Sequence, residues 1–228
     1  VNTVWMQNST DIGFLDKAPG GRKLSSPQKD RALTYRDNMY YDFYRTRGFC
    51  FPPSNLYNHD PIYGNEAKIK MTDDQFREYL FTNAARGTQF WEHYYSFNMM
   101  DENKWRISNA AVSFARENAN CLSRSVLFGG KPSLFQVYGF GCFDGNEGIV
   151  ALRNPGADAQ EYTLALDKTC GADERLSSVG VTTILPYLKS GESGSFSFGD
   201  TLKLTLSPFE TRILHFGKRR EKIQAVYC

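Results

Sequence analysis

The sequence predicts a mixed fold in which an α/β segment over residues 1–130 is followed by an all-β segment over residues 131–228. In the first segment strand-like runs alternate with helical runs, which is the repeat of a parallel α/β architecture. In the second, short β runs are separated by Gly, Asn and Asp and show hardly any helical periodicity, which favours an antiparallel β-sandwich. The chain has 228 residues, of which 41% are hydrophobic, enough for one large domain or two small ones.

The α/β segment opens with a β-rich run at residues 1–14 and continues through a loop at 15–25 that is rich in Pro and Gly. The Ser-Pro pair at 26–27 is typical of a helix N-cap followed by Pro at the first helical position. The helix is expected to end at Gly48, and residues 49–51 then predict a second apolar strand.

Two further helices are expected in this segment. Thr72 with Gln75 three residues later is a capping-box signature. The helix that follows has apolar residues at roughly helical spacing, namely Phe76, Leu80, Ala84, Phe90, Trp91 and Tyr94. The next helix is expected over residues 108–122, with its small apolar face turned inward at Val112, Ala115 and Ala119.

The all-β segment contains seven candidate strands with turn residues between them. They cover residues 135–142, 148–153, 161–166, 179–187, 195–198, 202–206 and 211–216. Short strands at this spacing, with no helices between them, predict the sandwich.

Composition excludes several function classes. Lys and Arg total 27 against 25 for Asp and Glu, a net charge of +2, which gives no electrostatic case for nucleic acid as the partner. No run approaches the ~18 apolar residues of a membrane span. The 5 cysteines lack the spacing of a zinc site, and no glycine loop resembles a dinucleotide fingerprint, so neither a metal nor a cofactor is expected. An odd number of cysteines argues against a disulfide framework and leaves room for one bridge, although incidental thiols are commoner.

Polar residues gather at 7–11 and 55–60, where the predicted strands end. Because ligand sites form at the carboxyl ends of parallel strands, both clusters are expected on the same face. Asp11 is placed there to accept hydrogen bonds from a sugar hydroxyl or to act as an acid or base. The alternative is an Asp that caps the turn at Gly13.

The stretch Asn58-His59-Asp60 brings an amide, an imidazole and a carboxylate together. Alternate residues of an extended segment point the same way, so Asn58 and Asp60 share a side and His59 faces the other. Such a group suits a ligand with several hydroxyls. The alternative is a local turn set up by Asp60 before Pro61.

Arg86, Trp91 and Glu92 combine an aromatic ring with polar neighbours. An indole that stacks on a pyranose, with Arg and Glu holding its hydroxyls, is a common way to build a sugar site. At helical spacing, however, Trp91 is more often a core residue, and Glu92 then belongs to a solvated or capping face.

Several motifs together resemble a known family. The run from Trp5 to Phe14, a helix, and the run from Phe51 to His59 resemble the last two strands of retaining α-glycosidase barrels. The α-glucosidase and α-galactosidase group carries a similar Asp-Ile-Gly-(Gly)-Phe turn, followed by Asn-His at the next strand end. The Asn154-Pro155 turn and the closing run at 206–214 are similar to the β-sandwich that follows such barrels. Endo-α-N-acetylgalactosaminidases share this layout, and one glycine instead of two after Ile12 leaves the subfamily open.

The resemblance implies that residues 1–130 are C-terminal strand–helix units of a (β/α)8 barrel and that residues 131–228 are a β-sandwich accessory domain. It implies a glycoside hydrolase that acts on α-linked glycans with retention, in which Asp11 and His59 line the subsite of the sugar to be cleaved. In such enzymes two carboxyl groups ~5–5.5 Å apart carry the chemistry. In the family both come from earlier strands.

We therefore expect the chain to be part of a longer polypeptide, without hydrolytic activity of its own, since a full barrel takes ~250 residues. The expected partner is an oligosaccharide or glycan, and the family suggests an extracellular or periplasmic location. The alternative is a non-catalytic carbohydrate-binding module.

Overall fold

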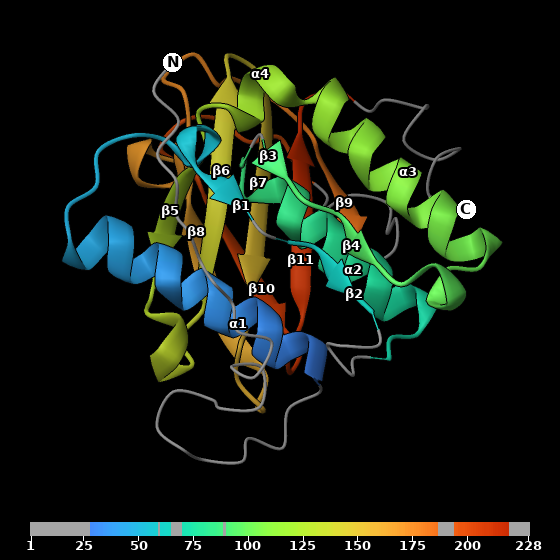
Figure 1. Cartoon of the computed structure of the whole chain (residues 1–228). Helices are drawn as coiled ribbons and strands as arrows, with labels where there is room; N and C mark the ends of the chain where they lie inside the picture. Colours follow the sequence, from blue (N-terminus) through green and yellow to red (C-terminus); the bar gives the residue numbers. More distant parts are fainter. Residues whose placement is uncertain (1–27, 59, 65–69, 89, 187–193, 219–228) are drawn as a thin grey trace.

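A computed structural model describes residues 28–58, 60–64, 70–88, 90–186 and 194–218. The predicted first strand at residues 1–14 lies outside these ranges. Helices and antiparallel sheets are both present, and a five-stranded antiparallel sheet occupies the centre (Figure 1). Helices cover one face of this sheet and a two-stranded sheet covers the other.

The first described helix ends where predicted, and its predicted N-cap at residues 26–27 lies outside the described ranges. Helix α1 spans Gln28–Tyr41, continues as a π-helical turn over Asp42–Thr46, and stops before Gly48, whose φ is +67°. The strand predicted at residues 49–51 is wrong. That stretch is irregular and leads into a 3-10 turn at Pro53–Asn55, because two consecutive prolines lack the N–H groups that a sheet ladder needs.

A β–α–β unit follows. Its elements are β1 (Tyr57–Asn58), β2 (Ile62–Tyr63), α2 (Asp73–Ala85), β3 (Phe90–Trp91) and β4 (Tyr94–Tyr95). Strand β1 pairs in parallel with β3, and β2 pairs in parallel with β4. The expectation that helix α2 continues to Tyr94 is wrong. The helix ends at Ala85 because Gly87 adopts φ +83°, and a Cβ there would overlap the carbonyl oxygen of Leu122.

The next helix begins earlier than predicted. Helix α3 spans Glu102–Glu117 because Asp101 caps it, accepting a 2.9 Å hydrogen bond from the Lys104 N–H; a short helix α4 follows over Ala119–Leu122. The core-facing side of α3 carries Ile107, Ala111 and Phe114. The inward face of the helix is therefore not the one predicted. The three residues expected there are only partly buried: Val112, Ala115 and Ala119.

Six of the seven candidate strands are present. The central sheet has the order β5-β6-β7-β11-β9 and is antiparallel throughout. Its strands are β5 (Val126–Gly129), β6 (Tyr138–Asp144), β7 (Glu147–Arg153), β9 (Val181–Leu185) and β11 (Thr211–Phe216). The two-stranded sheet pairs β8 (Gln160–Ala165) with β10 (Thr201–Leu206). The candidate at 195–198 forms only an isolated bridge between Phe196 and Val179, and β5 was not predicted.

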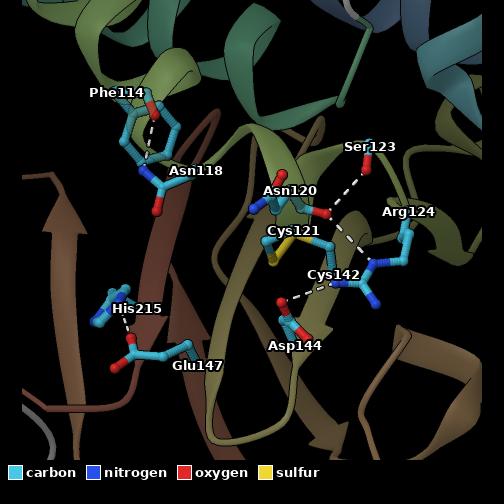
Figure 2. Close-up of a disulfide and its surroundings, with 10 residues drawn as sticks. All are labelled: Phe114, Asn118, Asn120, Cys121, Ser123, Arg124, Cys142, Asp144, Glu147 and His215. Carbon is cyan, nitrogen blue, oxygen red and sulfur yellow. Dashed lines mark hydrogen bonds and ion pairs between the residues drawn. A yellow bond between two sulfur atoms is a disulfide. The ribbon is translucent and has the colours of Figure 1, made fainter.

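Side chains alternate between the two faces of the central sheet. On β7 and β11, Ile149 and Ile213 pack with the helices, whereas Val150 and Leu214 pack with the two-stranded sheet. A disulfide between Cys121 and Cys142, whose Cα atoms are 5.4 Å apart, joins α4 to β6 (Figure 2). It is the one bridge for which the cysteine count left room.

Candidate functional site

Five of the seven predicted site residues lie in the described part of the chain. Asp11 and His59 fall outside it. Asn58 belongs to β1 and Trp91 to β3, and the parallel register of these strands sets the two residues directly opposite each other. Asp60 lies just before β2, Arg86 follows α2, and Glu92 follows β3.

Asp60 is buried among polar partners. Its Oδ2 accepts a 2.8 Å hydrogen bond from Nε of Arg36, and its Oδ1 accepts a 3.0 Å bond from the hydroxyl of Tyr79. The same hydroxyl accepts a 3.0 Å bond from the N–H of Ile62. The carboxylate therefore connects α1, α2 and the start of β2, and its oxygens are used inside the fold.

Arg86 lies in the same network and is fully buried. Its Nε donates to Asp37 at 2.6 Å, its Nη1 lies 3.6 Å from Asp60 Oδ2, and its guanidinium carbon is 5.6 Å from the centroid of the Tyr40 ring. Burial alone would lower the pKa of Arg86, but the adjacent carboxylates outweigh it and the pKa is raised. The guanidinium is thus a fixed positive charge between two buried carboxylates.

The network continues to the central sheet. Arg153, at the end of β7, donates from Nη2 to Asp30 of α1 at 2.6 Å and from Nη1 to the Thr211 hydroxyl at 3.0 Å. Glu78 of α2 accepts a 3.0 Å bond from the N–H of Thr211. The sheet and both helices are therefore held by buried charges, which the sequence reasoning did not single out. One available signal was the spacing of Asp30 and Asp37, which share a face of α1 seven residues apart.

Three buried tyrosines complete the network. Burial raises the pKa of Tyr40 to about 12 and holds the pKa values of Tyr79 and Tyr138 well above 10. The Tyr138 hydroxyl donates to the second oxygen of Asp37 at 2.5 Å. These phenols remain protonated donors at neutral pH.

Trp91 lines a pocket of about 370 Å³, which is within the range of small-ligand sites. Its ring stacks on that of His93 with centroids 5.8 Å apart and an interplanar angle of 15°, and its Nε1 donates to the Thr88 carbonyl at 2.7 Å. The rest of the pocket wall consists of Ala84, Val112, Ala115, Arg116, Ala119 and Leu122. The orientation of the indole is therefore fixed, and an aromatic ring and an arginine line the same pocket.

Two protonation features accompany this pocket. Burial lowers the pKa of His93, so its ring is neutral at pH 7. Glu92, next to Trp91, does not line the pocket, and its hydrogen bond with Tyr94 raises the pKa of that phenol. Trp91 is therefore a predicted residue whose described side chain lines a pocket, and Glu92 beside it is partly exposed as well.

Over the described ranges, no group of three or more His, Cys, Asp or Glu side chains is arranged to hold a metal ion. None of the helices described is both long enough and apolar enough to cross a bilayer.

No family model matches the chain, and no curated protein matches it. Among solved structures, an α-amylase from Anoxybacillus matches with a TM-score of 0.49 and 12% identity over 84% of this chain and 46% of that one. The α-galactosidase I of Mortierella vinacea matches with a TM-score of 0.45 and 16% identity over 72% and 40%. The α-galactosidase of Saccharomyces cerevisiae, solved with raffinose, matches with a TM-score of 0.45 and 11% identity over 70% of this chain and 47% of that one. The chain spans less than half of each of these proteins, so the matches are distant and partial.

Proposed function

We propose that this chain forms part of a glycoside hydrolase that acts on α-linked glycans. Residues 1–130 would supply the last strand–helix units of a (β/α)8 barrel, and residues 131–228 a β-sandwich accessory domain. The motifs around Asp11 and His59 support this assignment through their resemblance to α-glycosidases. The parallel pairing of β1 with β3 and of β2 with β4, with α2 between the paired strands in the chain, has the connectivity that such barrels repeat and supports the proposal.

The observation that carries the proposal is the parallel register of β1 with β3. It places Asn58, the first residue of the Asn-His motif, opposite Trp91 of the neighbouring strand. An amide and an imidazole bind sugar hydroxyls, and an indole stacks on the apolar face of a pyranose ring. Two stretches of the chain that suit a sugar are therefore adjacent in the fold.

Asp60 and Arg86 take a different role in this proposal from the direct sugar contacts expected of them. Their carboxylate and guanidinium are buried and bonded to α1 and α2, so they act as positioning residues that hold the chain at residue 60. A substrate-binding segment held in this way loses little conformational entropy when the sugar binds.

The catalytic carboxylates remain unassigned in this chain. A retaining enzyme needs two carboxyl groups that reach the anomeric carbon and its leaving oxygen. Asp30, Asp37 and Asp60 are buried and each accepts a hydrogen bond from an arginine, which suits them to hold structure. In this proposal the chain contributes to sugar binding, and a further part of the enzyme contributes the carboxylate pair.

The test uses the whole chain with aryl α-galactoside, α-glucoside and α-N-acetylgalactosaminide. We expect no turnover, together with millimolar binding of one of the free sugars, followed by NMR, that is lost in His59→Ala. Arg106→Gln, at an exposed position of α3, should bind like the wild type. Turnover by the chain alone would contradict the proposal that the catalytic carboxylates lie elsewhere in the enzyme. Absence of sugar binding would contradict the glycosidase assignment.

A non-catalytic carbohydrate-binding module is the second candidate, and the Trp91 pocket favours it because it is an aromatic-walled cavity in the described part of the chain. Ala115→Phe should fill this pocket, since Ala115 lines it from α3. Sugar binding that is lost in Ala115→Phe but retained in His59→Ala would support the module. The reverse pattern would support the barrel subsite.

A further inference from the structure

A second pocket lies on a different part of the molecule. It has a volume of about 450 Å³ and forms where the turn after α1, the α4–β5 junction and a 3-10 turn at Lys168–Cys170 meet. Its lining residues are Tyr44, Arg45, Phe49, Cys50, Phe51, Pro52, Pro53, Arg124, Ser125, Val126, Leu127, Lys168 and Thr169. It shares none of them with the Trp91 pocket.

Three cations line this second pocket, and no acidic residue does. Arg45 is exposed and is held by a 3.0 Å hydrogen bond from Nη2 to the Leu127 carbonyl. Arg124 is oriented by the Asn120 carbonyl at 3.3 Å and by Asp144 at 3.0 Å (Figure 2). Lys168 lies 2.6 Å from Glu174 and is largely exposed. Two of the cations are thus partly neutralised from outside the pocket, whereas Arg45 has no ion-pair partner in the described part of the chain.

The lining also contains a group of aromatic side chains. The Phe49 ring lies 4.2 Å from that of Phe43 and 5.5 Å from that of Phe51, measured between centroids. Phe51 is 53% exposed, and its ring is therefore open to a ligand on the side away from Phe49. Ser125, almost fully buried in the same lining, has a hydroxyl without a partner in the structure. Aromatic rings, three cations and a serine hydroxyl without a hydrogen-bond partner therefore line one cavity.

We propose that this pocket binds a sugar unit that carries a carboxylate or a sulfate. The apolar face of the ring would lie against Phe51 and the anionic group would face Arg45 and Lys168. The choice of a saccharide rests on the proposed function, while the negative charge of the ligand follows from the lining itself. The site would extend recognition beyond the neutral α-linked sugar to an acidic unit of the same glycan.

Cys50 supplies the readout because it is exposed and lines the pocket. In the full chain carrying Cys228→Ser, the alkylation rate of Cys50 by neutral iodoacetamide is measured with galactose, galacturonate, galactose 6-sulfate or inorganic sulfate present. Galacturonate and galactose differ in the oxidation state of one carbon, so the pair isolates the charge. We expect the two anionic sugars to slow alkylation at least threefold at saturation and galactose to have no effect. Protection should weaken at 1 M salt, where the Debye length falls to ~3 Å.

Variants separate the contribution of the cations from that of the aromatic lining. Lys168→Gln and Arg45→Gln should each weaken galacturonate binding about twofold to fivefold, the range of exposed ion pairs, and Phe51→Ala should abolish it. Lys168 makes no core contact, so its variant tests charge even if Arg45→Gln unfolds. Arg106→Gln is the control.

Equal protection by galactose, equal protection by inorganic sulfate, or no protection by any of the three sugars would each overturn the inference. Because the readout is Cys50, loss of neutral-sugar binding in His59→Ala would leave it unchanged. The two proposals therefore fail separately.

Discussion

Arg86 is the residue on which the buried charges of the helical layer converge. It contacts carboxylates from α1 and from the segment before β2, and no solvent reaches it. A paired charge of this kind adds little net stability over an apolar group, but loss of one partner leaves the others buried and unpaired. Arg86 therefore matters to stability mainly because its loss would leave buried carboxylates without their cation.

Replacement of Arg86 by Met should destabilise the protein by about 3–5 kcal/mol, because Asp37 and Asp60 would lose their shared cation. Urea unfolding at pH 7 measures the change. Arg106→Met on α3, where Arg106 pairs with Glu102 at an exposed site, should cost less than about 0.5 kcal/mol. A similar, small loss in both variants would show that the buried ion pairs of Arg86 contribute no more to stability than an exposed pair.

Sequence reasoning could recognise the chemistry of Asp60 and Arg86 but not their location. Carboxylate and guanidinium groups beside Pro61 and Gly87 are equally compatible with a ligand site and with an internal ion pair. Which of the two applies depends on α1, whose Arg36 and Asp37 are separated from them by more than twenty residues. Burial of this kind is a tertiary property, and no local pattern reports it.

At the scale of single elements, the start of α2 depends on a reciprocal cap. The Thr72 hydroxyl accepts a 3.3 Å bond from the Gln75 N–H, and the Gln75 side chain accepts a 3.1 Å bond from the Thr72 N–H. Thr72→Ala should therefore cost about 1 kcal/mol in urea unfolding. Thr72→Ser keeps the hydroxyl and should stay within about 0.3 kcal/mol of the wild type. Equal losses in the two variants would assign the effect to the methyl group instead.

Helix α3 begins with a cap that titrates. The hydrogen bond from the Lys104 N–H, followed by the Lys104 side chain, lowers the pKa of Asp101 below 3.8. A depressed carboxyl pKa stabilises the folded state above the ordinary pKa, and this stabilisation is lost as the pH falls through the folded pKa. Asp101→Asn keeps an acceptor oxygen but does not titrate.

We therefore expect the midpoint of thermal unfolding of the wild type to exceed that of Asp101→Asn at pH 7 and the difference to shrink below pH 4. Comparing the two proteins cancels the titration of all other carboxyl groups. A difference that stays constant down to pH 2.5 would show that the charge of Asp101 has no part in the cap.

Element boundaries were predictable where a local signal acts alone. The capping box at Thr72 and the positive φ at Gly48 both gave their helix ends correctly. The end of α2 was missed because the aromatic residues after Gly87 continue at helical spacing, although the glycine itself marks a C-terminal cap. Strand β5 was missed because four residues are too few for periodicity, and its place is set by pairing with β6.

On the scale of the whole molecule, the central sheet is held to the helices in two ways. Apolar residues such as Ile149 and Ile213 pack with α2 and α3, and Arg153 bonds to Asp30 of α1. The pattern of short β runs separated by turn residues predicted antiparallel strands. It did not predict that helices would cover one face, because both faces of β7 are apolar and nothing local distinguishes a helical neighbour from a second sheet.

The disulfide adds a covalent connection between these two layers, and its removal should lower the stability of the protein. Cys121 and Cys142 are 21 residues apart, and a cross-link closing a loop of this length stabilises a protein by about 3 kcal/mol, mainly through the unfolded chain. Both cysteines are buried, so Ala is the suitable replacement, since it leaves no buried hydroxyl without a partner. The double variant Cys121→Ala/Cys142→Ala should lose about 3 kcal/mol in urea unfolding, and dithiothreitol should lower the wild type to the same level without affecting the variant.

Cys50→Ala, at an exposed free thiol, should change stability by less than about 0.5 kcal/mol. If the double variant matched the wild type, the packing of α4 against β6 would by itself account for the association of the layers.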